Sequence, residues 1–295
     1  MSAASPKPNN AVSGQPEQLN SICNLIIPLD GTVLSRSAIP VARVLSEICG
    51  ATPHVIYAGQ GLLHPNEMSS LLGVGEPQLP GAVFDCCNDD PAGMIMEAAR
   101  NLAESLIVMC THSGSHPSGF GHVADSVLAS GPERIVMVPP ERGERVWSLR
   151  RILLAHDGTP DSDLASGAAA EISMMADAEV TALHVAARQA ARPEQPGSLT
   201  APRYIDQPQH EWPAWTQEFV DRMLTMGAPA SAVRFKLVVA GGRPGSEIAQ
   251  LAREKKANLI VMAWDGEWQS ARHVATRVVI RSCGCPVLLV RSRAQ

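Results

Sequence analysis

Aromatic side chains are scarce in this sequence of 295 residues, at 4% of the total. The core must therefore be built mainly from Val, Leu, Ile, Ala and Met. Hydrophobic residues still make up 45% of the sequence and charged residues only 18%, which excludes wholesale disorder and allows a sizeable core. At about 150 residues per domain, the length favours two domains.

The sequence also lacks long apolar runs. Its longer apolar stretches, such as residues 106–110 (LIVMC), are far shorter than the roughly 18–20 residues that cross a membrane. Residues 1–21 are mostly polar, contain several prolines and have no apolar segment of the kind that directs secretion, so we expect a disordered tail. We therefore expect a cytoplasmic protein without a membrane partner.

Seven cysteines are present, but no two of them are spaced as Cys-x-x-Cys. That spacing is typical of zinc ribbons and thioredoxin-like redox sites, so neither class has support. We expect buried free thiols in a reducing compartment. Cys283 and Cys285 lie just before an apolar run, which favours packing, with a redox-sensing role as the alternative.

The net charge of −5 is unevenly distributed. Residues 1–148 contain 7 Lys and Arg against 14 Asp and Glu, whereas residues 149–295 contain 17 against 15. Neither half has the concentrated basic surface of a nucleic-acid-binding protein, so we expect no nucleic-acid partner.

The sequence repeats itself in three blocks that keep their order. Two copies of one domain are the economical interpretation, at residues 22–140 and 149–293, with a linker at residues 141–148. The offset between the copies rises from 127 to 153, so the second copy has extra residues, most of which we expect in a surface loop at residues 193–212. The paired blocks are residues 25–32 with 152–159, 91–109 with 244–262, and 121–127 with 272–278.

Short β-rich runs alternate with amphipathic stretches in both copies. Several runs are apolar at consecutive positions, which is typical of parallel strands buried on both faces. The alternation predicts an α/β layer fold with right-handed crossovers. The predicted strands are residues 24–29, 54–58, 82–86, 105–110 and 134–138, then 151–156, 179–186, 234–240, 258–263 and 287–291. The predicted helices are residues 35–49, 91–104 and 120–130, then 161–176, 214–226, 245–255 and 269–282.

The loops after two strands of each copy could bind a ligand, because ligands of open parallel sheets lie beyond the carboxyl ends of the strands. Asp-Gly-Thr follows the first strand, at residues 30–32 and 157–159. Asp30 and Asp157 could cap the next helix or accept a hydrogen bond from a ligand. The loops after the fourth strands, at residues 111–121 and 264–271, lead into helices, where backbone N–H groups can hold a phosphate.

Several motifs together resemble the universal stress protein family: Asp-Gly-Thr after the first strand, LHV at residues 183–185, ANLIVM at residues 257–262, and CPVLLVR at residues 285–291. The resemblance covers about residues 22–293 as a tandem pair. It implies two tandem α/β/α domains, each a five-stranded parallel sheet of the adenine nucleotide α-hydrolase-like fold. It also implies pairing through the last strands, as a homodimer or as a pseudo-dimer within the chain.

Some members of that family bind ATP, through Gly-x2-Gly-x9-Gly-(Ser/Thr) after the fourth strand, and others do not. Both copies depart from this pattern, and the second gap is shortened to seven and five residues. A side chain at Arg272 obstructs the close approach of backbone to phosphate. The family positions fall on Cys110, Ser113, Gly121 and His122 in the first copy, and on Ala263, Gly266, Arg272 and His273 in the second.

The resemblance therefore implies a non-catalytic stress-response regulator that binds a small ligand or a protein partner, with degenerate nucleotide motifs. The alternative is an ATP-binding tandem member with variant loops, and ATP is the one candidate cofactor. An enzyme would need an acid or base, for which Asp30, Asp157, His112 and His122 are the candidates, but no hydrolase or kinase motif accompanies them. His112, His116 and His122 match no strong metal-binding pattern. The candidate ligand-binding residues are Asp30, Ser113, Gly114, Gly121, His122, Asp157, Gly266, Arg272 and His273.

Overall fold

Ten strands form one continuous sheet, in the order β3-β2-β1-β4-β5-β10-β9-β6-β7-β8. The strands are β1 (Asn24–Leu29), β2 (Thr52–Tyr57), β3 (Val83–Cys86), β4 (Ser105–Cys110), β5 (Arg134–Val138), β6 (Arg151–Ala155), β7 (Glu179–Ala186), β8 (Phe235–Gly241), β9 (Leu259–Trp264) and β10 (Val287–Arg291). The computed structural model describes residues 22–57, 63–86, 90–112, 120–140, 146–186, 218, 221, 235–270 and 273–292.

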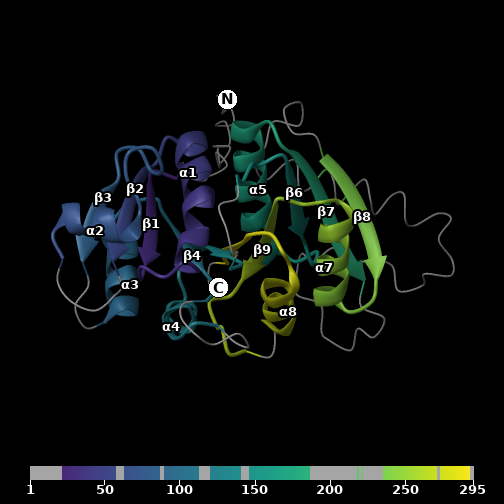
Figure 1. Ribbon diagram of the computed structural model, residues 1–295. Coiled ribbons are helices and arrows are strands. Elements are labelled where there is room, and N and C mark those ends of the chain that lie inside the picture. The colour runs from purple at the N-terminus through teal and green to yellow at the C-terminus, as the bar shows by residue number, and fades with distance from the viewer. Residues whose placement is uncertain are drawn as a thin grey trace, which may run out of the picture.

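The sheet consists of two halves with the same internal strand order. Strands β1–β5 form the first half and strands β6–β10 the second, and neighbours within each half are parallel. The halves meet where β5 and β10 pair antiparallel, with Ile135 opposite Leu289. The last strands therefore pair within the chain, and each lies between two other strands. Figure 1 shows β1, β2 and β3 at one side of the molecule and β6, β7 and β8 at the other.

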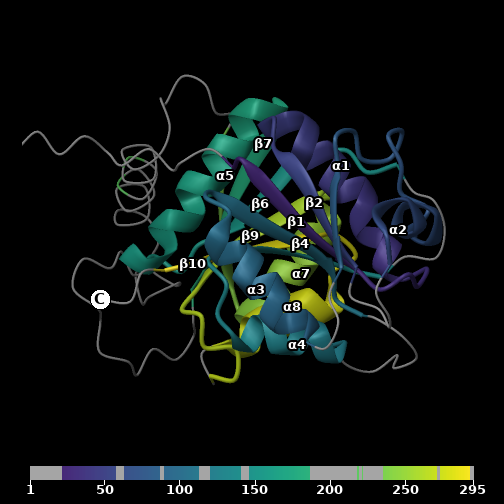
Figure 2. The ribbon, with the colours of Figure 1, turned by 90° about the vertical axis from the view of Figure 1, so that its left-hand side faces the viewer.

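The helices cover both faces of the sheet. Figure 2 shows α1 and α5 on one face and α3, α4, α7 and α8 on the other. Contacts join α1 to α5, α3 to α4, and α7 to α8. The bounds are α1 (Ala38–Cys49), α2 (Pro65–Leu72), α3 (Pro91–Asn101), α4 (His122–Ala129), α5 (Asp163–Ala176), α7 (Pro244–Glu254) and α8 (Val274–Ser282), with short 3-10 turns at Ser35–Ser37 and Pro160–Ser162.

The core continues from one half into the other on both faces. Alternate residues of a strand point to opposite faces, so Leu25 belongs to one apolar cluster and Ile26 to the other. Each cluster also contains residues of the second half, such as Leu154 and Leu289. The sheet junction is therefore part of the core.

The fold class predicted from the sequence is confirmed, and five predicted strands have the predicted bounds. The other five strands shift by one or two residues at an end. Helix α2 was not predicted. Helix α3 ends earlier than predicted, and Glu104, at the end of the predicted helix, has a left-handed φ of 52°. The predicted loop at residues 193–212 and nearly all of the predicted helix at residues 214–226 lie outside the described residues.

Within the described residues, no helix combines the length and apolarity needed to cross a bilayer.

Candidate functional site

Each half has a point where the crossover connections diverge, between β1 and β4 in the first half and between β6 and β9 in the second. Ligands of open α/β sheets bind beyond the carboxyl ends of the strands at such a point. We call the residues after β1 and β4 the first switch point, and those after β6 and β9 the second. The candidate ligand-binding residues follow these four strands.

At the first switch point, Asp30 fixes the turn that follows β1. Its Oδ1 accepts hydrogen bonds from the backbone N of Thr32 at 2.9 Å and from Thr32 Oγ1 at 2.6 Å. Ser35 N donates to Thr32 Oγ1 at 3.2 Å, which extends the network into the first turn of the next helix. Gly31 supplies the positive φ of 83° that the turn requires. The geometry therefore gives Asp30 the turn-capping role that we considered from the sequence.

The two ends of the loop after β4 are joined by a backbone hydrogen bond. Gly121 N donates to the carbonyl of Thr111 at 2.9 Å, and Thr111 N donates to the carbonyl of Val138 at 2.9 Å. Gly121 is buried and His122, the first residue of α4, is exposed. Ser113, Gly114 and His116 lie outside the described residues.

His112, at the first switch point, is influenced by a charge of the second half, that of Arg281. Its Nδ1 lies 2.8 Å from Thr111 Oγ1. Burial lowers the pKa of His112, and the positive charge of Arg281 on α8 lowers it further. The guanidinium of Arg281 lies 5.2 Å from the ring centroid of Phe120, next to Gly121.

Cys110, which ends β4, and Cys283 and Cys285, which precede β10, are poor nucleophiles. Burial raises the pKa of Cys110 to about 11, that of Cys283 to about 11 and that of Cys285 to about 12. A reactive thiol needs a lowered pKa. The three thiols are therefore protonated at neutral pH, in agreement with a packing role for them.

At the second switch point, Asp157 fixes an equivalent turn with one more partner. Its Oδ1 accepts hydrogen bonds from Thr159 N at 2.9 Å, Thr159 Oγ1 at 2.6 Å and Ser162 Oγ at 2.6 Å. Burial of the carboxylate acts to raise the pKa of Asp157, but the hydrogen bonds from Ser162 and Thr159 outweigh it, so the pKa is lowered.

A buried pair of histidines supports this second turn. Gly158 N donates to His156 Nδ1 at 2.9 Å, so Nδ1 is an acceptor and the proton lies on Nε2, 3.3 Å from Asp163 Oδ1. His184 Nδ1 lies 3.0 Å from the carbonyl oxygen of His156. Burial lowers the pKa of His184. We did not single out this pair in the sequence, although at an offset of 127 it stands where the first half has Leu29 and Tyr57.

Two candidate residues after β9 face protein groups. His273 is buried and its Nε2 is hydrogen-bonded to Asp265 Oδ1, which also accepts from Glu267 N at 2.8 Å. Gly266 has a φ of 85°, and a Cβ there would lie 2.6 Å from Arg291 Nε. Arg272 lies outside the described residues.

The loop after β9 reaches across to the first half through Trp268. This side chain is 2% exposed and its Nε1 donates to Asp125 Oδ1 on α4 at 2.8 Å. Its ring meets Phe120 edge to face, with centroids 5.1 Å apart. We call these three side chains the Trp268 bridge. This contact between the halves was not predicted, and its one trace in the sequence is the presence of Trp268 in the predicted loop at residues 264–271.

Arg277 fixes the position of the loop after β9. This loop includes residues that were predicted to begin α8. Arg277 Nη1 donates to the carbonyls of Trp268 at 2.6 Å and Ser270 at 3.1 Å. Residues 268–270 form a turn, with Ser270 N bonded to the Glu267 carbonyl at 2.9 Å. The helix predicted at residues 269–282 begins at Val274.

Among the described residues, no three His, Cys, Asp or Glu side chains are grouped so that they could hold a metal ion.

A model of the universal stress protein family matches residues 148–291. The crystal structure of a universal stress protein from Archaeoglobus fulgidus DSM 4304 aligns over 93% of this chain and 98% of its own, at 16% identity and a TM-score of 0.62. A functionally unknown protein from Pseudomonas aeruginosa PAO1 aligns over 93% of this chain and 94% of its own, at 15% identity and a TM-score of 0.60. At these identities the likeness shows the fold alone. No curated protein matches the chain.

Shorter structures align with about half of the chain. One is a universal stress protein in complex with cAMP, which covers 50% of this chain and 99% of its own at 20% identity and a TM-score of 0.38. Another, from Archaeoglobus fulgidus, is in complex with dAMP and covers 48% of this chain and 98% of its own at 14% identity and a TM-score of 0.33. These TM-scores are too low to transfer a ligand to this chain.

Proposed function

The chain belongs to the universal stress protein family through residues 148–291, and its first half repeats the same strand order; we propose that it is a tandem, cytoplasmic, non-catalytic stress-response regulator. In this proposal the first switch point binds a phosphate-bearing small ligand, with ATP as the first candidate. The residues of the second switch point stabilise the fold and bind no ligand in this proposal.

The observation that carries this assignment is the different use of the two loops. At the second switch point, Asp265 is hydrogen-bonded to His273, and Trp268 donates a hydrogen bond to Asp125 of the first half. At the first switch point, the exposed His122 begins α4 next to the buried Gly121, and the first turn of a helix is favourable for an anion.

A regulatory rather than catalytic role is supported by the use of the candidate acids and bases. Asp30 and Asp157 each accept two or three hydrogen bonds within their own turns. His112 is bonded to Thr111 Oγ1. A general base must be free to reach a substrate proton, and these three side chains are engaged within the fold. The fourth candidate, the exposed His122, is a ligand contact in this proposal, so we expect no ATP hydrolysis beyond the background rate in a phosphate-release assay.

Native mass spectrometry of the full chain with Mg-ATP tests the ligand and its place. We expect one nucleotide per chain in the wild type and none in His122→Glu, which places a negative charge at the start of α4. The matched control is Val274→Glu at the first residue of α8, which is 54% exposed. Acidic residues are favourable in the first turn of a helix, so both variants should fold.

Three results would overturn the proposal. Binding of two nucleotides per chain would show that both switch points are open to ligand. Loss of binding in Val274→Glu but not in His122→Glu would place the ligand in the second half. No bound nucleotide at millimolar ATP would leave a protein partner as the function to pursue.

A further inference from the structure

An open pocket lies at the edge of the second half that is remote from both switch points. It is a shallow hollow of about 90 Å³, lined by the amino ends of β6, β7 and β8 and by the turn between α7 and β9. The switch points lie at the carboxyl ends of the strands. A ligand in this pocket would therefore not compete with a ligand of the proposed function.

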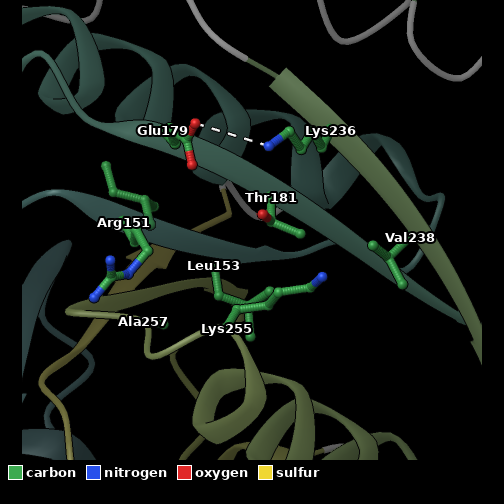
Figure 3. A pocket seen from close by; sticks show the side chains of 9 residues that line it. Arg151, Leu153, Glu179, Thr181, Lys236, Val238, Lys255 and Ala257 are labelled. Atoms are coloured by element: carbon green, nitrogen blue, oxygen red, sulfur yellow. Dashed lines mark ion pairs between the residues drawn. The ribbon is translucent and has the colours of Figure 1, made fainter.

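The rim of the pocket carries an excess of positive charge. Its lining contains the cations Arg151, Lys236 and Lys255 but only one carboxylate, that of Glu179. Figure 3 shows Lys236 and Lys255 on opposite sides of the opening, with Thr181 and Leu153 between them. Opposed cations around a hydroxyl group are suited to an anion that accepts several hydrogen bonds.

The internal partners of these cations do not neutralise the rim. Lys236 Nζ lies 3.7 Å from Glu179 Oε1, and the two side chains are 71% and 43% exposed, so this ion pair is weak. Arg151 donates its Nε to the backbone carbonyl of Lys256 at 2.9 Å. That bond fixes the guanidinium without neutralising it.

The floor of the pocket is apolar. The half-buried Val238 and Ala257 line it below the charged rim, and the fully buried Leu153 lies beneath them. A small inorganic anion would leave the exposed part of Val238 and Ala257 in contact with water, whereas an apolar group attached to the anion would cover it.

The first half has no equivalent of this charge. At the same register positions, Arg151 and Glu179 correspond to Asn24 and Thr52, and Lys236 corresponds to Val83. At an offset of 153, Lys255 corresponds to Leu102. The three cations are therefore a property of the second half and not of the repeated fold.

From this arrangement we propose that the pocket at the amino ends of β6, β7 and β8 is a second binding site, for a small phosphate monoester with an apolar group. The phosphate lies between Lys236 and Lys255 and the apolar group lies on Val238 and Ala257.

The test is an NMR titration of the ¹⁵N-labelled full chain with phenyl phosphate, with inorganic phosphate and phenol as separate probes. We expect shifts at residues 151–153, 179–181 and 236–238, and tighter binding of phenyl phosphate than of either other probe. Lys255→Gln should weaken binding about fivefold, as for one exposed charge contact. Glu179→Gln should strengthen it, a gain that damage to the fold would not produce.

The matched control is Lys256→Gln. It removes the same charge at the neighbouring residue, whose side chain does not line the pocket. It should change the affinity less than twofold. Equal losses in Lys255→Gln and Lys256→Gln would reduce the effect to net charge and overturn the proposal. Equal binding of phenol, equal binding of inorganic phosphate, or shifts confined to the switch points would also overturn it. The proposed ATP test is unaffected by any of these results.

Discussion

The two halves of the sheet have the same strand order, but they use the loop after the fourth strand differently. In the first half, Gly121 N closes this loop onto Thr111, and His122 is exposed at the start of α4. In the second half, the loop is fixed by Arg277 and inserts Trp268 against the first half. A repeated fold therefore conserves the scaffold while one copy of a ligand loop becomes an internal interface.

The turns after β1 and β6 show the same divergence at a smaller scale. Both Asp carboxylates accept hydrogen bonds from the Thr two residues later. Only the second turn rests on the buried His156, whose place in the first half is taken by Leu29. Because ionisable histidines support the second turn inside the core, we expect its stability to depend on pH.

The largest effect is expected from breaking the Trp268 bridge. Trp268→Ala removes a buried ring and leaves Asp125 without its indole donor, so it should lower the free energy of unfolding by about 3–5 kcal/mol. Trp268→Phe keeps one aromatic ring but loses the indole N–H and part of the buried ring volume, at about 2 kcal/mol. Urea unfolding measures both. A loss below 1 kcal/mol in Trp268→Ala would show that the halves hold together without this contact.

A smaller effect is expected at Gly266. Its φ of 85° is unfavourable for alanine, and the new Cβ would lie 2.6 Å from Arg291 Nε, so Gly266→Ala should cost about 2 kcal/mol. The control is Gly50→Ala, where φ is 65° but nothing lies within 4 Å of the Cβ, with a cost of about 1 kcal/mol. Equal losses in urea unfolding would show that the close approach to Arg291 is relieved without cost.

The scaffold could be predicted because its signals are local and repeated. Consecutive apolar residues in β4 and β10 indicate strands buried on both faces, and the structure places them as predicted. Helix α2 was missed because its eight residues give little periodicity and, among residues 66–72, only Met68 and Leu72 are buried. Short elements are fixed by tertiary packing more than by pattern.

The use of the site residues could not be predicted in the same way. The repeat aligns residues 264–271 with residues 111–121, so sequence reasoning assigned both loops to a ligand. Whether Trp268 turns toward a ligand or toward α4 depends on the antiparallel pairing of β5 and β10, which brings the halves together. That pairing joins residues at least 150 positions apart, and no local pattern reports it.

Replacing the carboxylate at the second turn should have a moderate effect. Asp157→Asn weakens three hydrogen bonds to Oδ1 and should lower the free energy of unfolding by about 1 kcal/mol at pH 7. Because the pKa of Asp157 is lowered in the fold, its contribution is present above the unfolded value of 3.8 and is lost as the pH falls through the folded value. The difference from the wild type in urea unfolding should therefore shrink below pH 4. A difference that stays constant down to pH 2 would contradict a role of the charge.

The smallest effect, and the most specific to one half, is expected from His184. Burial lowers its pKa below 6.5, against the opposing effects of the hydrogen bond to the His156 backbone carbonyl and of the negative charge of Asp157. The unfolded chain then binds a proton more readily than the folded chain, so stability falls as the pH drops below 6.5. His184→Tyr copies Tyr57 of the first half and should remove this part of the pH dependence. An NMR titration of the wild-type imidazole checks the cause directly, and a His184 pKa at or above 6.5 would contradict it. If both tests hold, acidification weakens the second half at the turn that carries Asp157 and spares the equivalent turn in the first.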